Sequence, residues 1–143
     1  MIYQVMLLPN YTTTIYQVPM NTVNPKSQVI LVRPRVYIGK NLSIGPGKID
    51  LLRAIGEARS ISAAARSMDL PYKRAWLLIN TLNEGFPCPV VETATGGKGG
   101  GGASLTPLGV QLVEAYDALE KRLNSQASPE LELLRQLTEP QIY

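Results

Sequence analysis

Residues 61–80 read ISAAARSMDLPYKRAWLLIN, and this stretch decides the fold because it has the pattern of a helix-turn-helix. Two helices that cross at a steep angle need a small residue where they touch, and Ala65 supplies it. Asp69 occupies the turn position, and Asp tolerates the left-handed backbone of such a turn better than most residues. Apolar residues occupy the positions where the motif needs them: Ala64, Met68, Leu70, Ala75 and Leu78. An ordinary helical hairpin is the alternative that this segment alone leaves open.

The second of these helices is predicted to carry a basic and aromatic surface on its N-terminal half. In a DNA-binding helix-turn-helix, this half enters the major groove. Lys and Arg side chains there read guanine O6 and N7 or neutralise phosphates. We therefore expect DNA contacts from Tyr72, Lys73, Arg74 and Trp76 on the second helix and from Ser62 and Arg66 on the first. A core tryptophan is the alternative for Trp76, the one tryptophan of the chain.

The flanking segments give the element order of a winged helix-turn-helix. Ser60 or Ser62 can cap the helix that follows, and Gly85 is expected to end the second helix of the motif. Thr106 and Pro107 combine a hydroxyl cap with proline at the first helical position, which predicts another helix start. The expected order is strand 35–38, helix 48–59, helix 61–68, helix 72–85, strand 89–94, strand 103–105, helix 108–123 and helix 130–137.

Residues 94–103 read ATGGKGGGGA, and this glycine-rich segment has three possible interpretations. Residues 97–102 match the dinucleotide pattern G-x-G-x-x-G, but the next helix starts too late, and neither a second strand nor an acidic residue follows to complete such a site. A flexible linker is a poor interpretation because both flanks resemble strands of one small unit. The favoured interpretation is the tip of a wing, whose N–H groups can approach phosphates closely because glycine has no Cβ. The predicted wing contacts are Gly96, Gly97, Lys98, Gly99 and Gly100.

The composition is that of a globular protein of about one domain, with 143 residues, 45% of them hydrophobic and 17% charged. The net charge is +3, but residues 33–104 hold ten Lys or Arg against five Asp or Glu. The middle of the chain is therefore expected to face a polyanion. The single cysteine, Cys88, is expected to be a buried structural thiol in a cytoplasmic protein.

The residues that most enzymes need are missing from the sequence. The chain has no histidine and no pair of carboxylates placed for acid–base work, which argues against an enzyme. The lack of histidine also argues against a transition-metal site, and we expect no cofactor. No apolar run is long enough to span a membrane.

Together these motifs resemble the DNA-binding domain of the ModE family, the molybdate-responsive transcriptional regulators, which are relatives of the LysR-type winged helix-turn-helix. The resemblance runs from Val36 to Arg122. Its most specific parts are SxSxAA at residues 60–65, Tyr72-Lys73 with Ala75-Trp76, the glycine wing, and LTPLG at residues 105–109. The resemblance implies a dimeric regulator whose recognition helix and wing contact operator DNA.

The same resemblance implies that the helix after the wing, roughly residues 107–124, helps to form the dimer. Its leucine stripe is consistent with this role, although such a stripe is more often core packing: Leu108, Leu112, Leu119 and Leu123. Two features depart from the family. Pro71 stands where many relatives have a small or hydroxyl residue, and we find no oxyanion-binding segment after the DNA-binding part. Molybdate binding is therefore not expected.

We predict a mainly α fold with a small β-wing, built as a winged helix-turn-helix plus a C-terminal dimerisation helix. The expected domains are an N-terminal arm of unknown role (1–32), a DNA-binding domain (33–106) and a C-terminal helical segment for dimerisation (107–143). The expected partners are double-stranded DNA and a second copy of the chain, with no membrane. A protein-docking module is the alternative, because winged helices also serve as docking units.

Overall fold

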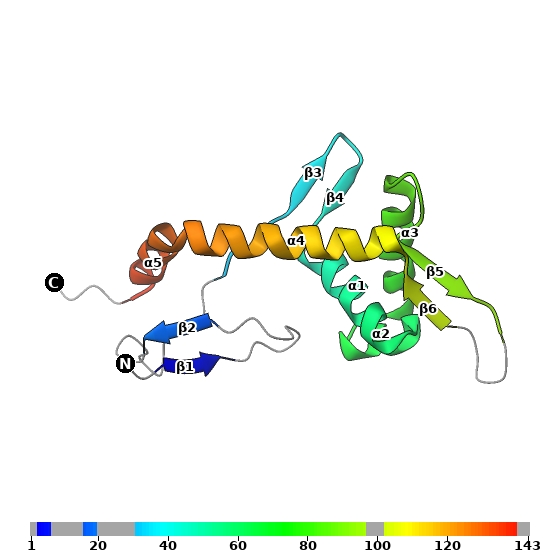
Figure 1. Cartoon of the computed structure of the whole chain (residues 1–143), viewed down its shortest axis with the longest axis horizontal. Coiled ribbons are helices and arrows are strands. Elements are labelled where there is room, and N and C mark those ends of the chain that lie inside the picture. The colour runs from blue at the N-terminus through cyan, green and yellow to red at the C-terminus, as the bar shows by residue number, and fades with distance from the viewer. Residues whose placement is uncertain (1–2, 7–15, 20–30, 97–101, 140–143) are drawn as a thin grey trace. The chain divides into compact units, whose positions relative to one another are not determined.

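The computed structural model describes four stretches of the chain, residues 3–6, 16–19, 31–96 and 102–139 (Figure 1). The chain divides into a smaller unit of residues 1–31 and 128–143 and a larger unit of residues 32–127. In the smaller unit, β1 (Tyr3–Met6) pairs antiparallel with β2 (Tyr16–Pro19), and α5 spans Ser128–Leu137. In the described residues no helix has both the length and the apolarity to cross a membrane.

The larger unit contains four helices and two antiparallel strand pairs within its described residues, so the expected mainly α fold is confirmed. Its elements are β3 (Val36–Ile38), β4 (Leu42–Ile44), α1 (Pro46–Ala58), α2 (Ile61–Ser67), α3 (Tyr72–Gly85), β5 (Val91–Ala94), β6 (Gly102–Leu105) and α4 (Pro107–Gln126). β3 pairs with β4, and β5 pairs with β6. Figure 1 shows α1, α2 and α3 gathered beside the N-terminal half of α4.

The core of the larger unit lies between these helices. α1 contributes the largest share, with four buried aliphatic side chains at Ile49, Leu51, Leu52 and Ile55. Ala64 and Ala65 of α2 meet Ala75 of α3 in the same cluster, and all three are nearly or fully buried. Small side chains at this point let the two helices approach closely, as the sequence predicts.

The turn between α2 and α3 has the predicted geometry. Ser60, rather than Ser62, caps α2, and its hydroxyl accepts a hydrogen bond from the Ala63 N–H at 3.2 Å. Asp69 has a φ of 51°, which is the left-handed conformation expected at this position. The N–H of Leu70 returns to the carbonyl of Ala65 at 2.8 Å and closes the turn.

The strand pair β5–β6 is fixed to both α3 and α4 by hydrogen bonds. Asn83 of α3 accepts from the Val90 N–H at 2.8 Å, just before β5 begins. After β6, the Thr106 N–H donates to the carbonyl of Val90 at 3.0 Å. The Thr106 hydroxyl accepts from the Gly109 N–H at 3.1 Å, so Thr106 caps α4 as predicted. These bonds define where the strand pair leaves the helices.

Two expectations differ from the structure. The sequence pattern predicts only the first strand of the β3–β4 pair, because the turn around Gly39, whose φ is 62°, separates two strands of three residues each. The prediction for Cys88 is wrong: this thiol is exposed. Cys88 lies between Pro87 and Pro89 in the connection from α3 to β5, and such connections run over the surface, where their backbone polar groups reach water.

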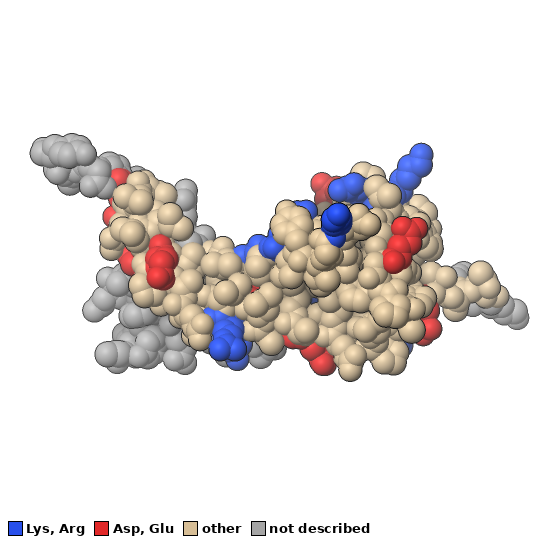
Figure 2. Space-filling view, turned by 90° about the horizontal axis from the view of Figure 1, so that it is seen from above, with Lys and Arg blue, Asp and Glu red and all other residues tan. Residues whose placement is uncertain are grey.

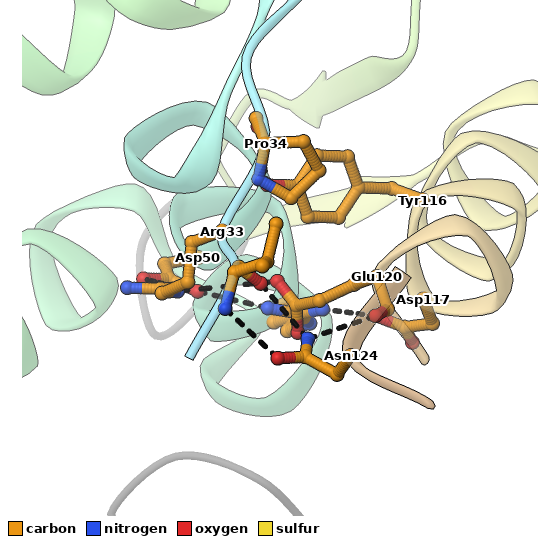
Figure 3. Close-up of polar contacts among 9 residues, drawn as sticks. Arg33, Pro34, Asp50, Tyr116, Asp117, Glu120 and Asn124 are labelled. Carbon is orange, nitrogen blue, oxygen red and sulfur yellow. Dashed lines mark hydrogen bonds and ion pairs between the residues drawn. The ribbon is translucent and has the colours of Figure 1, made fainter. Parts of the chain in front are cut away.

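Residues 32–35 lie along α4 and are held there by side chains of that helix (Figure 3). The Asn124 side chain makes two hydrogen bonds with the backbone of Val32, accepting from its N–H at 2.8 Å and donating to its carbonyl at 2.9 Å. The Tyr116 hydroxyl donates to the carbonyl of Pro34 at 2.7 Å. We call these contacts the clasp; they fix the chain immediately before Arg35.

Ion pairs link the same segment and α4 to α1. Arg33 lies 2.6 Å from Asp50 of α1 and 3.9 Å from Glu120 of α4. Arg53 of α1 pairs with Asp50 at 2.8 Å and also with Asp117 of α4. The carboxylates on this side of the unit therefore neutralise the two arginines beside them (Figure 3).

Candidate nucleic-acid interface

α3 has one buried face and one exposed face, which determines how its basic residues point. Ala75, Ile79 and Leu82 are buried and follow the spacing of one helical face. Lys73 and Arg74 fall outside that face and are exposed. The helix therefore presents two cations to solvent while its opposite side anchors it in the core.

Two aromatic residues occupy the first turns of the same helix. Tyr72 is 54% exposed, and its ring meets that of Trp76 edge to face, with centroids 6.3 Å apart. Trp76 is half-buried and packs against the core. The alternative of a core tryptophan is therefore right in part, because the core holds Trp76 and Trp76 supports the exposed ring of Tyr72.

α2 places the other two predicted contact residues at the surface. Ser62 and Arg66 are both exposed. The Ser62 hydroxyl lies 3.2 Å from that of Ser60, the residue that caps this helix. Since Ser62 and Arg66 are four residues apart, they lie on one face of α2.

The basic residues of the larger unit fall into two classes. Arg33 and Arg53, close to α4, are paired with carboxylates. Within residues 31–96, by contrast, seven cations have no carboxylate of the described chain within ion-pair distance: Arg35, Lys40, Lys48, Arg59, Arg66, Lys73 and Arg74. Figure 2 shows several Lys and Arg side chains gathered on one part of this unit. Unpaired cations of this kind generate a positive potential that attracts polyanions.

Two basic residues that sequence reasoning missed lie near α3. Burial lowers the pKa of the Lys48 ammonium, and the positive charges of Arg35 and Arg74 lower that pKa further. Lys48 belongs to α1, Arg35 precedes β3, and Arg74 belongs to α3. Nothing in the local sequence links these three positions, since only the folded chain brings them together.

The predicted wing is described only in part. β5 and β6 pair from Val91 opposite Leu105 to Ala94 opposite Gly102. Gly96 is exposed and has a φ of 34°. The other predicted contacts, Gly97, Lys98, Gly99 and Gly100, lie outside the described residues.

The leucines expected at a dimer interface divide between two environments. Leu108 and Leu112 are partly buried against the core of the same chain. Leu119 and Leu123 are half-buried and do not belong to that core cluster. The first pair is thus explained by packing within the chain, and the second pair remains the candidate for contact with another copy.

Groups that could hold a metal ion are missing from the described part of the chain, which contains no cluster of three or more His, Cys, Asp or Glu suited to one. The arrangement on α2 and α3 is one of hydrogen-bond donors and positive charges. Its chemistry suits the binding of a polyanion.

Comparison with curated proteins finds similarity over about half of the chain. MopB of Rhodobacter capsulatus, named a molybdenum-pterin-binding protein, is 51% identical over 77 residues, or 54% of this chain and 28% of that protein. ModE of Escherichia coli K12, named a DNA-binding transcriptional dual regulator, is 45% identical over 80 residues, or 56% of this chain and 30% of its own. ModE of Haemophilus influenzae, named a transcriptional regulator, is 40% identical over 86 residues, or 60% and 34% of the two chains.

These relatives are regulators or molybdenum-pterin-binding proteins by name, and none of the three names describes an enzyme. The matched part of this chain spans about a third of their length. No protein-family profile matches the chain.

Proposed function

We propose that this chain is a DNA-binding transcriptional regulator of the winged helix-turn-helix type. The observation that carries the proposal is the pair Lys73 and Arg74, exposed and without carboxylate partners in the described chain, on a helix whose other face is buried in the core. A rigid helix with unpaired cations on its first turn is suited to enter the major groove. The similarity to regulators named ModE supports the same function.

Each residue of the interface has a distinct role in this proposal. Lys73 and Arg74 read guanine edges or neutralise phosphates, and Tyr72 donates a hydrogen bond to phosphate. Ser62 and Arg66 contact the backbone from α2. Strands β5 and β6, with the glycine-rich residues between them, act as the wing, in which Lys98 adds a cation.

The regulator is proposed to act as a homodimer. Two copies of α3 would enter successive major grooves about 34 Å apart on an inverted repeat. Leu119 and Leu123 on α4 are the candidates for the contact between copies, because they lie outside the core cluster of their own chain. Molybdate binding is not expected for this chain, although relatives are named for molybdenum. Calorimetric titration with molybdate tests this expectation, and saturable tight binding would contradict it.

The test is a fluorescence-anisotropy titration with a pool of randomised duplexes at several salt concentrations, followed by sequencing of the bound fraction. We expect binding that weakens steeply with salt and an enriched inverted repeat. A steep salt dependence without enrichment would indicate a non-specific DNA-binding protein instead. No binding at low salt would contradict the proposal.

A matched pair of variants makes the titration specific to α3. Lys73→Ala removes an exposed cation from the proposed interface, whereas Lys121→Ala removes an exposed cation from the later part of α4. Loss of one phosphate contact lowers affinity by about eight-fold at 0.1 M salt. We expect that loss for Lys73→Ala and wild-type affinity for Lys121→Ala. Equal affinities for the two variants would exclude Lys73 from the interface.

A protein-docking module is the second candidate, favoured by the apolar side chains that α3 exposes. Leu77 is 54% exposed, as is Tyr72. The double variant Lys73→Glu and Arg74→Glu discriminates between the two functions. Unchanged nucleic-acid binding by this folded variant would favour docking, whereas loss of binding would favour DNA recognition by α3.

A further inference from the structure

Two cations from separate segments lie at the start of α1, and a third on α3 acts on one of them. Lys48 donates from Nζ to the carbonyl of Ser43 at 2.7 Å. The Arg35 side chain lies against Gly45, where an added Cβ would stand 3.4 Å from its Nε. Arg74 of α3 completes the group, since its charge and that of Arg35 both act on Lys48. We call Arg35, Lys48 and Arg74 the basic cluster.

The basic cluster is not neutralised by the described part of the chain. No carboxylate within residues 31–96 or 102–139 lies at ion-pair distance from any of its members. Three like charges held close together repel one another and lower the stability of the folded chain. Uncompensated clusters of this kind are typical of sites that bind an anion.

The first turn of α1 adds further donors at the same place. Gly45 is its N-cap and makes no side-chain capping bond, Pro46 follows, and the first turn holds no acidic residue. The N–H groups of the first turn of a helix have no partner within the helix, and they favour a negative charge nearby. Phosphate is a frequent ligand of such helix starts when cations accompany them.

The clasp fixes the position of Arg35. Tyr116 of α4 holds the carbonyl of Pro34, and Arg33 is paired with Asp50 of α1. The backbone on the N-terminal side of Arg35 is therefore tied to both helices. A fixed backbone at Arg35 lowers the conformational entropy that is lost when its side chain binds a ligand.

We propose that Arg35, Lys48 and the first turn of α1 bind a backbone phosphate of the same DNA duplex that α3 reads. The inference rests on the proposed function. Duplex DNA fits better than a free anion because α1, which carries the site, shares one core with α2 and α3. The exposed cations of those two helices, Arg66, Lys73 and Arg74, form the proposed major-groove surface of the same unit.

The test compares Arg35→Gln and Lys48→Gln with the matched control Lys121→Gln, by anisotropy at several salt concentrations. Two duplexes are used, the selected inverted repeat and an unrelated sequence. Removing one phosphate contact lowers affinity by about eight-fold at 0.1 M salt and reduces the slope of log affinity against log salt by about 0.9. We expect these changes for both cluster variants on both duplexes, with the preference for the inverted repeat unchanged.

Two results would overturn the inference in distinguishable ways. If the wild-type chain binds DNA with a steep salt dependence and both cluster variants bind as tightly as the wild type, the phosphate site is rejected while the proposed function stands. If the wild-type chain binds no DNA, both fail. A third arm titrates inorganic phosphate alone; a saturable thermal shift at submillimolar phosphate that Lys48→Gln abolishes would indicate a free-anion site and would also overturn the inference.

Thermal unfolding separates binding from folding. Lys48→Gln removes a repelling charge and also the 2.7 Å bond from Nζ to the Ser43 carbonyl, and these two changes act on stability in opposite directions. We therefore expect an unfolding temperature close to that of the wild type together with weaker DNA binding. Lys48→Arg keeps the charge and is expected to keep the salt slope. Loss of DNA binding by Lys48→Arg together with a lowered unfolding temperature in both variants would assign Lys48 a structural role and reject the phosphate contact.

Discussion

Gly109 has no room for a side chain, because α4 passes directly against the end of the α3–β5 connection. A Cβ at this position would lie 2.2 Å from the carbonyl oxygen of Val90, which itself accepts a hydrogen bond from the Thr106 N–H. The glycine of the LTPLG motif is thus required by close packing. Backbone atoms must shift to admit even one methyl group here.

Gly109→Ala is expected to lower the free energy of unfolding by about 3 kcal/mol, the upper part of the usual range for an overpacked site. Gly47→Ala is the matched control, since no atom lies within 4 Å of a Cβ there and the residue is helical. The control is expected to be neutral or to stabilise by up to about 1 kcal/mol. Urea unfolding measures both; equal stabilities would contradict the close approach at Gly109.

Asn83 is the residue on α3 that connects the helix to β5. Its side-chain oxygen accepts from the N–H of Val90 at 2.8 Å and from that of Val91 at 3.3 Å, and its amide donates to the Val91 carbonyl at 3.3 Å. One side chain thus satisfies the backbone where the strand begins. The direction of the proposed wing relative to α3 depends on it.

Asn83→Ala is expected to destabilise the fold by about 1–3 kcal/mol, because backbone groups beside the buried Val90 and Val91 lose their partner. If the strand pair is the wing, the variant should also bind DNA more weakly below its unfolding transition. Asn80→Ala, on the exposed face of α3, serves as a control for stability. A variant at position 83 that unfolds like the control would show that the three bonds contribute nothing.

At the scale of elements, the clasp couples the segment before β3 to a helix far along the chain. Asn124 binds both backbone groups of Val32, and Tyr116, which is only 3% exposed, binds the carbonyl of Pro34. These side chains do for residues 32–35 what a neighbouring strand would do in a sheet. They keep the segment in place without any continuous pairing.

Asn124→Ala is expected to release the Val32 amide to hydrogen exchange while the amides of the α3 core, such as that of Ile79, stay protected. The reason is that the lost bonds belong to the clasp and not to the helical core. Hydrogen exchange followed by NMR measures both amides in one sample. Uniform acceleration across α3 would mean that the clasp supports the whole unit instead.

The helices of the larger unit were predictable because their signals are local. The residues at the α2–α3 contact, the left-handed Asp69 and the Thr106 cap follow from spacing and backbone preference, and the structure confirms them. β4 was not predicted, since three residues give too short a pattern. The exposure of Cys88 and the approach of Arg35 to Lys48 depend on contacts between distant segments, which no local pattern records.

For the whole molecule, the homodimer is the prediction that remains to be tested. Leu119 and Leu123 of α4 are half-buried and lie outside the core cluster formed by the described residues. Replacing both with Lys is expected to leave the monomer folded and to shift sedimentation from dimer to monomer at micromolar concentration. Loss of the dimer should also lower the affinity for an inverted repeat, because the two half-sites are then bound by separate monomers. A wild-type chain that sediments as a monomer would contradict the proposal.

The clasp also orders the events of biosynthesis. Val32 and Asn124 are 92 residues apart, and the ribosome makes the first long before the second. At about 5–20 residues per second, the segment before β3 waits roughly 5 to 20 seconds for its anchor. By the end of that interval α1, α2 and α3 have been synthesised, and of the contacts that hold the backbone around Arg35 only those with α4 are still missing. The residues of the proposed α3 surface are therefore made before the side chains of α4 that complete the clasp.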